Sequence, residues 1–246
     1  MNDYCVIKGD MRALTAYRLF IVTSIFFFFE DVHAVPDDYE AVYSVKLMQA
    51  DGTLRAKLEN KEGIYTYSLK TEPTGFWKLI ANGSINESSA FKLIDEKIRP
   101  INYKLIDTIR RNKRESLVEF DWSKKEINGF YKDRVIDVKL EEDILTRILL
   151  QIEIMHQKQR NRLKESYLII DRDEIKEIDI STSNSGKKIS VPFGSYDVIE
   201  VSHRSKGSNR INIFWLAPDL DFIPIRLEQT EDNKVNFEAN LVQLIR

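Results

Sequence analysis

The sequence predicts a mainly β protein with a single domain, in which a curved antiparallel sheet (a half-barrel or open barrel) packs on one long α-helix. Three observations predict this fold class. Apolar and polar residues alternate with period two over most of the chain. Turn-forming residues interrupt the alternation at short intervals. One segment, residues 143–160, changes to helical spacing. A content of 43% hydrophobic and 31% charged residues is typical of a globular chain.

The first 34 residues are interpreted as a signal peptide that directs export. Arg12 and Arg18 precede residues 19–29, an apolar run in which only a threonine and a serine are polar. A basic start, a short apolar run and a small-x-small end, here Val32-His33-Ala34, are typical of a secretory leader. The run is shorter than the roughly 20 residues that cross a membrane as a helix. An uncleaved anchor is the alternative interpretation.

Cleavage before Val35 is expected to leave residues 35–246 as a periplasmic domain without a transmembrane segment. Met11 is an alternative translation start, because the residues before it carry acidic side chains that suit a leader poorly. The single cysteine, Cys5, lies in the leader, so the mature domain is expected to depend on a packed core and to lack thiol chemistry. The net charge of -2 argues against a sequence-independent nucleic-acid binder.

The strands follow from alternation and from turn residues, in order along the chain. Residues 39–47 predict the first strand, because aromatic and aliphatic side chains occupy every second position. Asp51-Gly52, Glu62-Gly63 and Asn82-Gly83 are expected turns, since glycine adopts positive φ freely. Further strands are expected at 54–58, 64–69, 76–81, 85–94, 101–109, 116–122, 132–140, 167–171, 174–180, 194–202, 209–216, 223–229 and 236–244, with polar turns at 182–186 and 231–233.

Residues 143–160 are expected to form the one long helix. Ile148, Ile152 and Met155, with others, recur at helical spacing and make one apolar stripe. Acidic residues at the start and basic residues at the end complement the helix dipole. A stripe of this width usually covers the sheet of its own domain. A membrane-surface or partner-binding face is the alternative.

The mature sequence carries no recognisable catalytic or metal-binding pattern. It has two histidines, His156 and His203, and lacks HExxH, CxxC, G-x-S-x-G and glycine-rich phosphate motifs. We therefore expect no metal, no cofactor, no catalytic residue and no enzymatic activity. The one enzymatic alternative is a hydrolase that uses the carboxylates of the run from Asp171 to Asp179, for which a solvated hairpin is the preferred interpretation.

Strand aromatics are the better functional clue. A curved sheet lined by large apolar rings can enclose a pocket for an apolar ligand, whereas a filled core is the alternative. The leading hypothesis is a periplasmic, non-enzymatic protein that binds or carries an apolar envelope ligand such as a lipid. The alternative is an envelope protein–protein assembly module that pairs through a sheet edge. The candidate ligand-binding residues are Tyr103, Phe120, Trp122 and Trp215.

An ordered set of short motifs covers nearly all of the mature chain. The motifs are Ser89-Ala90-Phe91, Arg99–Tyr103, Val118–Trp122, Asp143–Thr146, Pro192–Tyr196, Trp215–Asp219 and Ile223–Arg226. Together they resemble an exported bacterial family known as domain of unknown function 3108, although Thr146 stands where the family has serine. The resemblance implies a β-rich periplasmic protein of Gram-negative bacteria and implies no activity. Periplasmic lipoprotein carriers, which are half-barrels that clasp a helix, are a fold analogy only.

Overall fold

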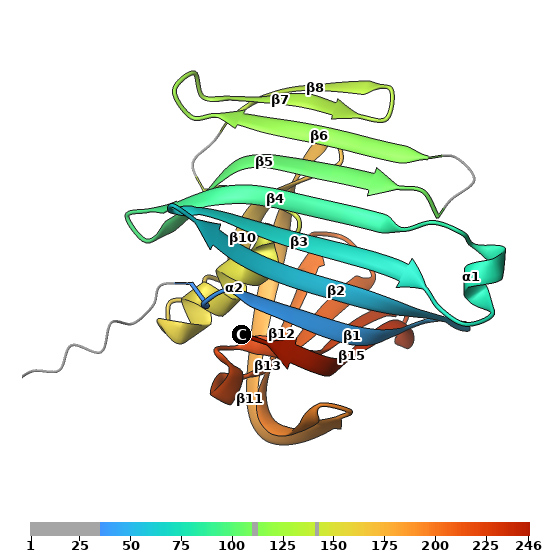
Figure 1. Cartoon of the computed structure of the whole chain (residues 1–246). Coiled ribbons are helices and arrows are strands. Elements are labelled where there is room, and N and C mark those ends of the chain that lie inside the picture. The colour runs from blue at the N-terminus through green and yellow to red at the C-terminus, as the bar shows by residue number, and fades with distance from the viewer. Residues whose placement is uncertain (1–34, 110–112, 141–142) are drawn as a thin grey trace, which may run out of the picture. The chain divides into compact units, whose positions relative to one another are not determined.

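The computed structural model describes residues 35–109, 113–140 and 143–246, the side chains of 184 and 185 excepted. These residues belong to one compact unit, drawn in colour in Figure 1. The predicted signal peptide, residues 1–34, lies outside the described residues.

The described residues form one sheet of fifteen strands, in the order β8-β7-β6-β5-β4-β3-β2-β1-β15-β14-β13-β12-β11-β10-β9. Neighbours pair antiparallel except β9 and β10, which are parallel. The prediction of a mainly β protein with one large sheet is therefore confirmed. The strands are β1 (Tyr39–Leu47), β2 (Ala50–Lys61), β3 (Ile64–Pro73), β4 (Ile85–Ile94), β5 (Lys97–Asp107), β6 (Arg114–Asp121), β7 (Glu126–Tyr131), β8 (Arg134–Lys139), β9 (Ile144–Thr146), β10 (Ser166–Asp171), β11 (Glu174–Val191), β12 (Gly194–Ser205), β13 (Arg210–Ala217), β14 (Ile223–Glu231) and β15 (Lys234–Ile245).

The sheet curls on itself like an incomplete barrel (Figure 1). The edge strand β9 packs against β5, near the other edge, and β6 to β8 extend beyond this contact. The inner, concave face carries the core, because cross-strand rows of apolar residues point inward. One such row runs through Val45, Ala239 and Leu227, all buried.

The prediction of one long helix over residues 143–160 is wrong. Residues 144–146 form β9, which pairs with β10 in the sheet, and the helix α2 covers only Leu149–Gln159. The helix also lacks the single apolar stripe that was expected. Its residues 149–156 are all buried, polar ones included, so side chains pack around the whole circumference inside the curled sheet. Neither helix in the described part of the chain has the length and hydrophobicity needed to cross a membrane.

Several smaller differences from the expected elements have local causes. The first turn falls at Met48, whose φ is 54°, and Asp51-Gly52 instead continues β2. Residues 77–80 form the short helix α1 (Trp77–Ile80) in place of a strand. The predicted strand 132–140 begins with a turn, and the unpredicted β7 precedes it. The expected turn at 182–186 is a register shift within the long strand β11. The turns at 62–63 and 231–233 are confirmed.

The two helices mark opposite ends of the barrel-like sheet. α1 lies where β1 ends and β2 begins, and α2 lies near the turn between β4 and β5 (Figure 1). We refer to these as the α1 end and the α2 end. The concave face between them holds the candidate site.

Candidate functional site

The concave face changes from closed to partly open along its length. Toward the α2 end its side chains are fully buried, as at Leu58 and Phe91. Toward the α1 end, the same face mixes buried side chains, such as Val45 and Leu54, with partly buried ones, although strand alternation points all of them inward. Solvent therefore reaches the concave face from the α1 end, over a lining that is mostly apolar. The partly buried residues are Leu69, Thr71 and Ile85 on one wall and Phe214, Gln229 and Phe237 on the other.

A buried ionic network lies between these two regions. The Tyr103 hydroxyl donates to Glu87 Oε2 at 2.7 Å, and Arg147 Nε donates to the same oxygen at 2.8 Å. Arg147 Nη2 also contacts Glu87 Oε1, so the guanidinium binds the carboxylate through two donors. Burial raises the pKa of the Tyr103 hydroxyl, which keeps it a hydrogen-bond donor.

Arg147 has an unusual environment within this network. It follows β9 directly and precedes α2, and Thr146 beside it is anchored by a hydrogen bond from its Oγ1 to Ser89 Oγ at 3.1 Å. The Arg147 side chain is 43% exposed, whereas Glu87 is 7% exposed. Since both side chains lie on the concave face, the exposed part of Arg147 marks the point at which solvent reaches the interior.

The structure brings three of the four predicted ligand-binding aromatics to one side of the molecule. Tyr103 contributes its hydroxyl to the Arg147 network, as described above. Phe120 is buried on β6, and its ring stacks on Trp122 with centroids 6.5 Å apart. Trp122 Nε1 donates to the carbonyl of Pro100 at 2.7 Å, and the Arg99 guanidinium lies 5.1 Å from the Trp122 ring centroid. The Trp122 ring is therefore held by the stacked Phe120 ring, by its hydrogen bond to Pro100 and by the Arg99 guanidinium.

Trp215 lies apart from the other three. It follows Phe214 on β13 and so points to the opposite, outer face of the sheet, in register with Arg226. Lys187 of β11 covers the ring, with Nζ 3.9 Å from its centroid. Trp215 is buried under β11 and does not line the concave face.

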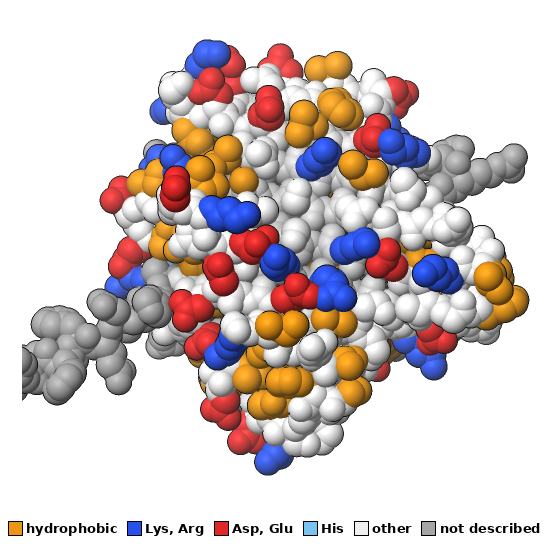
Figure 2. Space-filling model, viewed as in Figure 1, with side chains coloured by type: hydrophobic (Ala, Val, Ile, Leu, Met, Phe, Trp, Pro, Cys, Tyr) orange, Lys and Arg blue, Asp and Glu red, His pale blue; other side chains and the backbone are white. Residues whose placement is uncertain are grey.

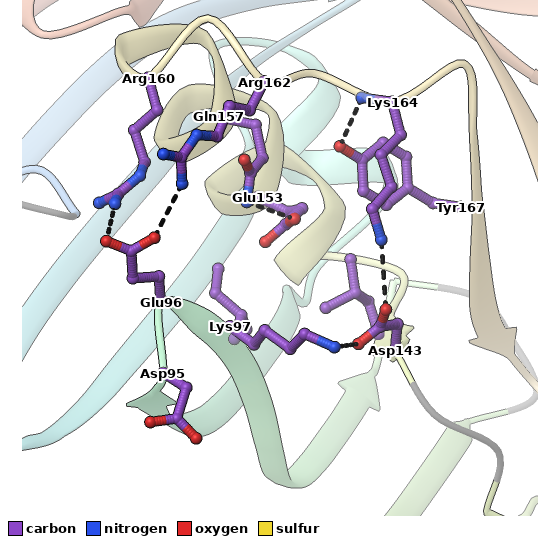
Figure 3. A pocket seen from close by; sticks show the side chains of 12 residues that line it. Asp95, Glu96, Lys97, Asp143, Glu153, Gln157, Arg160, Arg162, Lys164 and Tyr167 are labelled. Atoms are coloured by element: carbon purple, nitrogen blue, oxygen red, sulfur yellow. Dashed lines mark hydrogen bonds and ion pairs between the residues drawn. The ribbon is translucent and has the colours of Figure 1, made fainter.

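A second, polar cleft of about 190 Å³ opens at the α2 end (Figure 3). We call it the α2 cleft. Lys97 and Lys164 both bind Asp143, at 3.0 and 3.2 Å, while Glu96 binds Arg160 and Arg162. Its lining residues are Asp95, Glu96, Lys97, Ile98, Asp143, Leu145, Glu153, Gln157, Arg160, Arg162, Lys164 and Tyr167.

Glu153 is the chemically distinctive residue of the α2 cleft. Its side chain points from α2 into the cleft (Figure 3) and accepts a hydrogen bond from Gln157 Nε2 at 3.0 Å. Glu153 is 7% exposed, and burial raises the pKa of its carboxyl group from 4.5 to about 7. Carboxyl groups that titrate near neutral pH are found both at functional sites and in structural networks.

This raised pKa predicts a pH-dependent stability difference for Glu153→Gln. The folded protein holds the Glu153 proton between pH 4.5 and about 7, so the wild-type protein loses stability as pH rises through this range. The glutamine variant has no such loss and should be more stable than wild type at pH 8 by roughly 3 kcal/mol. At pH 4 the two should be nearly equal. Urea unfolding at both pH values measures the difference.

Glu96→Gln is the matched control at the same cleft. The Arg160 guanidinium beside Glu96 lowers the pKa of that exposed carboxyl group. Its removal should therefore cost stability at pH 8 and cost less in acid, the opposite sign to Glu153→Gln. Equal stability of Glu153→Gln and wild type at pH 8 would contradict the raised pKa of Glu153.

A third cleft, of about 210 Å³, adjoins the α2 cleft and shares Lys97, Ile98 and Asp143 with it. Trp122 lines this cleft together with Arg99. The structure thus places Trp122, predicted to bind a ligand, in the lining of a surface cleft, with its ring stacked on Phe120.

The carboxylates proposed for a hydrolase are occupied by cations. Asp171 binds Lys176 at 2.7 Å, and Asp173 binds Arg134 at 2.7 Å. Glu177 binds Lys206 at 3.2 Å. These ion pairs, which include one between the β10–β11 turn and Arg134 of β8, account for the acidic run as a charged hairpin, and hydrolase activity stays a prediction without geometric support.

His156 and His203 lie in separate places. His156 on α2 donates from Nε2 to the carbonyl of Glu96 at 2.9 Å, and burial lowers its pKa. His203 lies on β12 beside Phe214, and burial lowers its pKa to about 4. Within the described ranges, no group of three or more His, Cys, Asp or Glu side chains is close enough to hold a metal ion.

Arg147 and Glu87 were absent from the residues predicted from sequence. Glu87 carried a usable signal, because it shares a strand face with Ser89 and Phe91 and so places an acid among inward-facing residues. Arg147 carried none, since its partner lies 60 residues away in the chain.

Comparison with known proteins supports the fold and assigns no activity. The family described as "Protein of unknown function (DUF3108)" matches residues 38–240. A crystal structure titled a beta-barrel-like protein of domain of unknown function DUF1849, from Brucella abortus, is similar with a TM-score of 0.54 and 10% sequence identity, over 85% of this chain and 98% of that chain. No curated protein matches. Because the matched region spans most of the sequence, the chain belongs to the DUF3108 family.

Proposed function

We propose that the protein is a non-enzymatic periplasmic binding protein that takes up an amphipathic ligand, such as a lipid, on the concave face at the α1 end. The observation that carries this proposal is Arg147, which is 43% exposed on a concave face whose neighbouring open part is mostly apolar. An isolated exposed arginine on a surface would mean little. An arginine at the inner limit of an apolar, solvent-accessible surface supplies the polar contact that fixes a ligand's orientation.

The contacts of Arg147 indicate which ligand head would suit it. Its Nε and Nη2 bind Glu87, and in the described part of the chain Nη1 has no hydrogen-bond partner. Because Glu87 balances the charge, the pair favours an uncharged or zwitterionic head with oxygen acceptors over a multivalent anion. The apolar part of the ligand would lie along Leu69, Ile85 and Phe214.

Ligand content of the exported protein tests the proposal. We expect protein recovered from the periplasm, with an N-terminus at Val35, to yield co-purified lipid by mass spectrometry of its organic extract. An environment-sensitive apolar dye should bind the delipidated protein. Ile85→Glu, which places a charge on the apolar lining, should weaken dye binding roughly tenfold or more, because a buried Ile contributes about 1.5–3 kcal/mol.

Ser88→Glu is the matched control on the same strand. Ser88 points to the outer face, in register with Lys104, so the same charge should leave dye binding unchanged. A lipid-free protein that binds no dye, or equal loss in both variants, would show that the concave face is not the binding site.

A second candidate function, an envelope assembly module, is favoured by one observation. β8 ends the sheet order and pairs only with β7 among the described strands, so one edge is free. Val135 on this strand is highly exposed. In-cell crosslinking from residue 135 should capture a stoichiometric protein partner under this alternative and none under the binding-protein proposal.

A further inference from the structure

Six large apolar side chains at the α1 end are exposed to water. Their exposed fractions lie between 51% and 82%. Figure 2 shows hydrophobic side chains gathered at the right-hand tip, where Figure 1 places α1. We call this surface the α1-end patch. Its residues are Leu47, Met48, Phe76, Leu79, Ile80 and Val235.

Backbone hydrogen bonds hold these separate segments side by side. The Met48 amide donates to the carbonyl of Asn236 at 2.9 Å, which brings the β1–β2 turn to the start of β15. The Thr74 amide donates to the carbonyl of Asp51 at 3.0 Å, which anchors the approach to α1 beside β2. Exposed apolar side chains gathered at one end of a molecule in this way indicate an interaction site for protein or membrane.

Lysine side chains lie among the apolar residues of the α1-end patch, and their charge helps to decide whether the partner is a protein or a membrane. Lys46 precedes Leu47, Lys78 lies within α1, and Lys234 precedes Val235; all three are exposed. Within the described residues, none of the three lysines has a carboxylate partner, whereas Lys57 and Lys70 on the outer face pair with glutamates. Lys46 lies in register with Asp51 and Glu238, and Lys234 with Glu231, but neither lysine forms an ion pair with these carboxylates, so the ammonium groups can turn to an anionic surface.

We propose that the α1-end patch docks the protein on a bilayer surface that contains anionic lipids. Apolar side chains that enter the headgroup region, with lysines beside them, are the features of interfacial membrane binding. The patch also borders the part of the concave face that solvent reaches. The inference therefore rests on the proposed function in one respect: it places the entrance for an amphipathic ligand at the membrane.

Vesicle co-sedimentation of the leader-free protein recovered from the periplasm tests the docking. We expect binding to vesicles of phosphatidylcholine with phosphatidylglycerol, and weaker binding to phosphatidylcholine alone. The double variant Leu79→Asp/Ile80→Asp should lose roughly tenfold or more of the affinity, since two apolar side chains no longer leave water. The triple change of Lys46, Lys78 and Lys234 to glutamine should abolish the preference for anionic vesicles and the sensitivity to salt.

Ile64→Asp is the matched control, because Ile64 is an exposed apolar residue at the start of β3, at the opposite end. It should bind vesicles like wild type. Absence of wild-type binding, or equal loss in Ile64→Asp and the double variant, would overturn the docking proposal. Dye binding in solution is measured without vesicles, so a protein that binds dye and ignores vesicles refutes the docking alone. A protein that binds vesicles but neither lipid nor dye refutes the ligand site alone.

Discussion

Arg147→Met is expected to lower the free energy of unfolding by about 3 kcal/mol, because it leaves a buried carboxylate without its cation. Glu87 is 7% exposed and would keep only the Tyr103 hydroxyl as a partner. The reverse change, Glu87→Leu, should cost less, since the freed Arg147 is 43% exposed and can be hydrated. Urea unfolding at pH 7 measures both free energies.

The double variant Glu87→Leu/Arg147→Met provides the control for this pair. Replacing both ions by apolar groups removes the charge that the single variant leaves buried, so the double variant should recover most of the lost stability. A double variant as unstable as Arg147→Met would mean that the methionine itself packs badly. If the pair serves the ligand, dye affinity should fall in the double variant while stability is retained.

The strands could be predicted from sequence wherever local alternation decides the structure. Residues 39–47 alternate and form β1 as expected. The prediction failed where a distant strand decides. Residues 144–146 have a spacing that suits a helix, yet they pair with β10, and no local pattern records that pairing. Gly52 shows a related limit: its lack of a Cβ admits the carbonyl of Glu72 from the neighbouring strand, which a turn prediction cannot anticipate.

The candidate site could be predicted only in part, for the same reason. Tyr103 was selected for its ring, but the hydroxyl that binds Glu87 gives it its role in the network. Trp215 was selected by the same criterion and lies on the outer face. Alternation tells which residues share a face of one strand, and it leaves open which face of the curled sheet becomes concave.

Alanine substitutions on two sides of α2 are expected to have equally large effects. Ile152 lies on the apolar stripe that the sequence predicted, and Ile154 lies off it, two residues further on. Both are fully buried, so each change to alanine should lower the free energy of unfolding by about 3 kcal/mol. If α2 only covered the sheet with one apolar stripe, Ile152→Ala would lower the free energy of unfolding and Ile154→Ala would not. Urea unfolding of the two variants decides between a covering helix and an enclosed one.

Lys158→Ala, at the less buried end of the same helix, is the control for changes in helix propensity and should be nearly neutral. If Ile154→Ala is also nearly neutral, α2 has one face in water and the curled sheet does not enclose it. In that case the space beside Arg147 would be continuous with solvent along the whole helix. The apolar lining at the α1 end would then have no inner limit against which a ligand's polar head could be fixed.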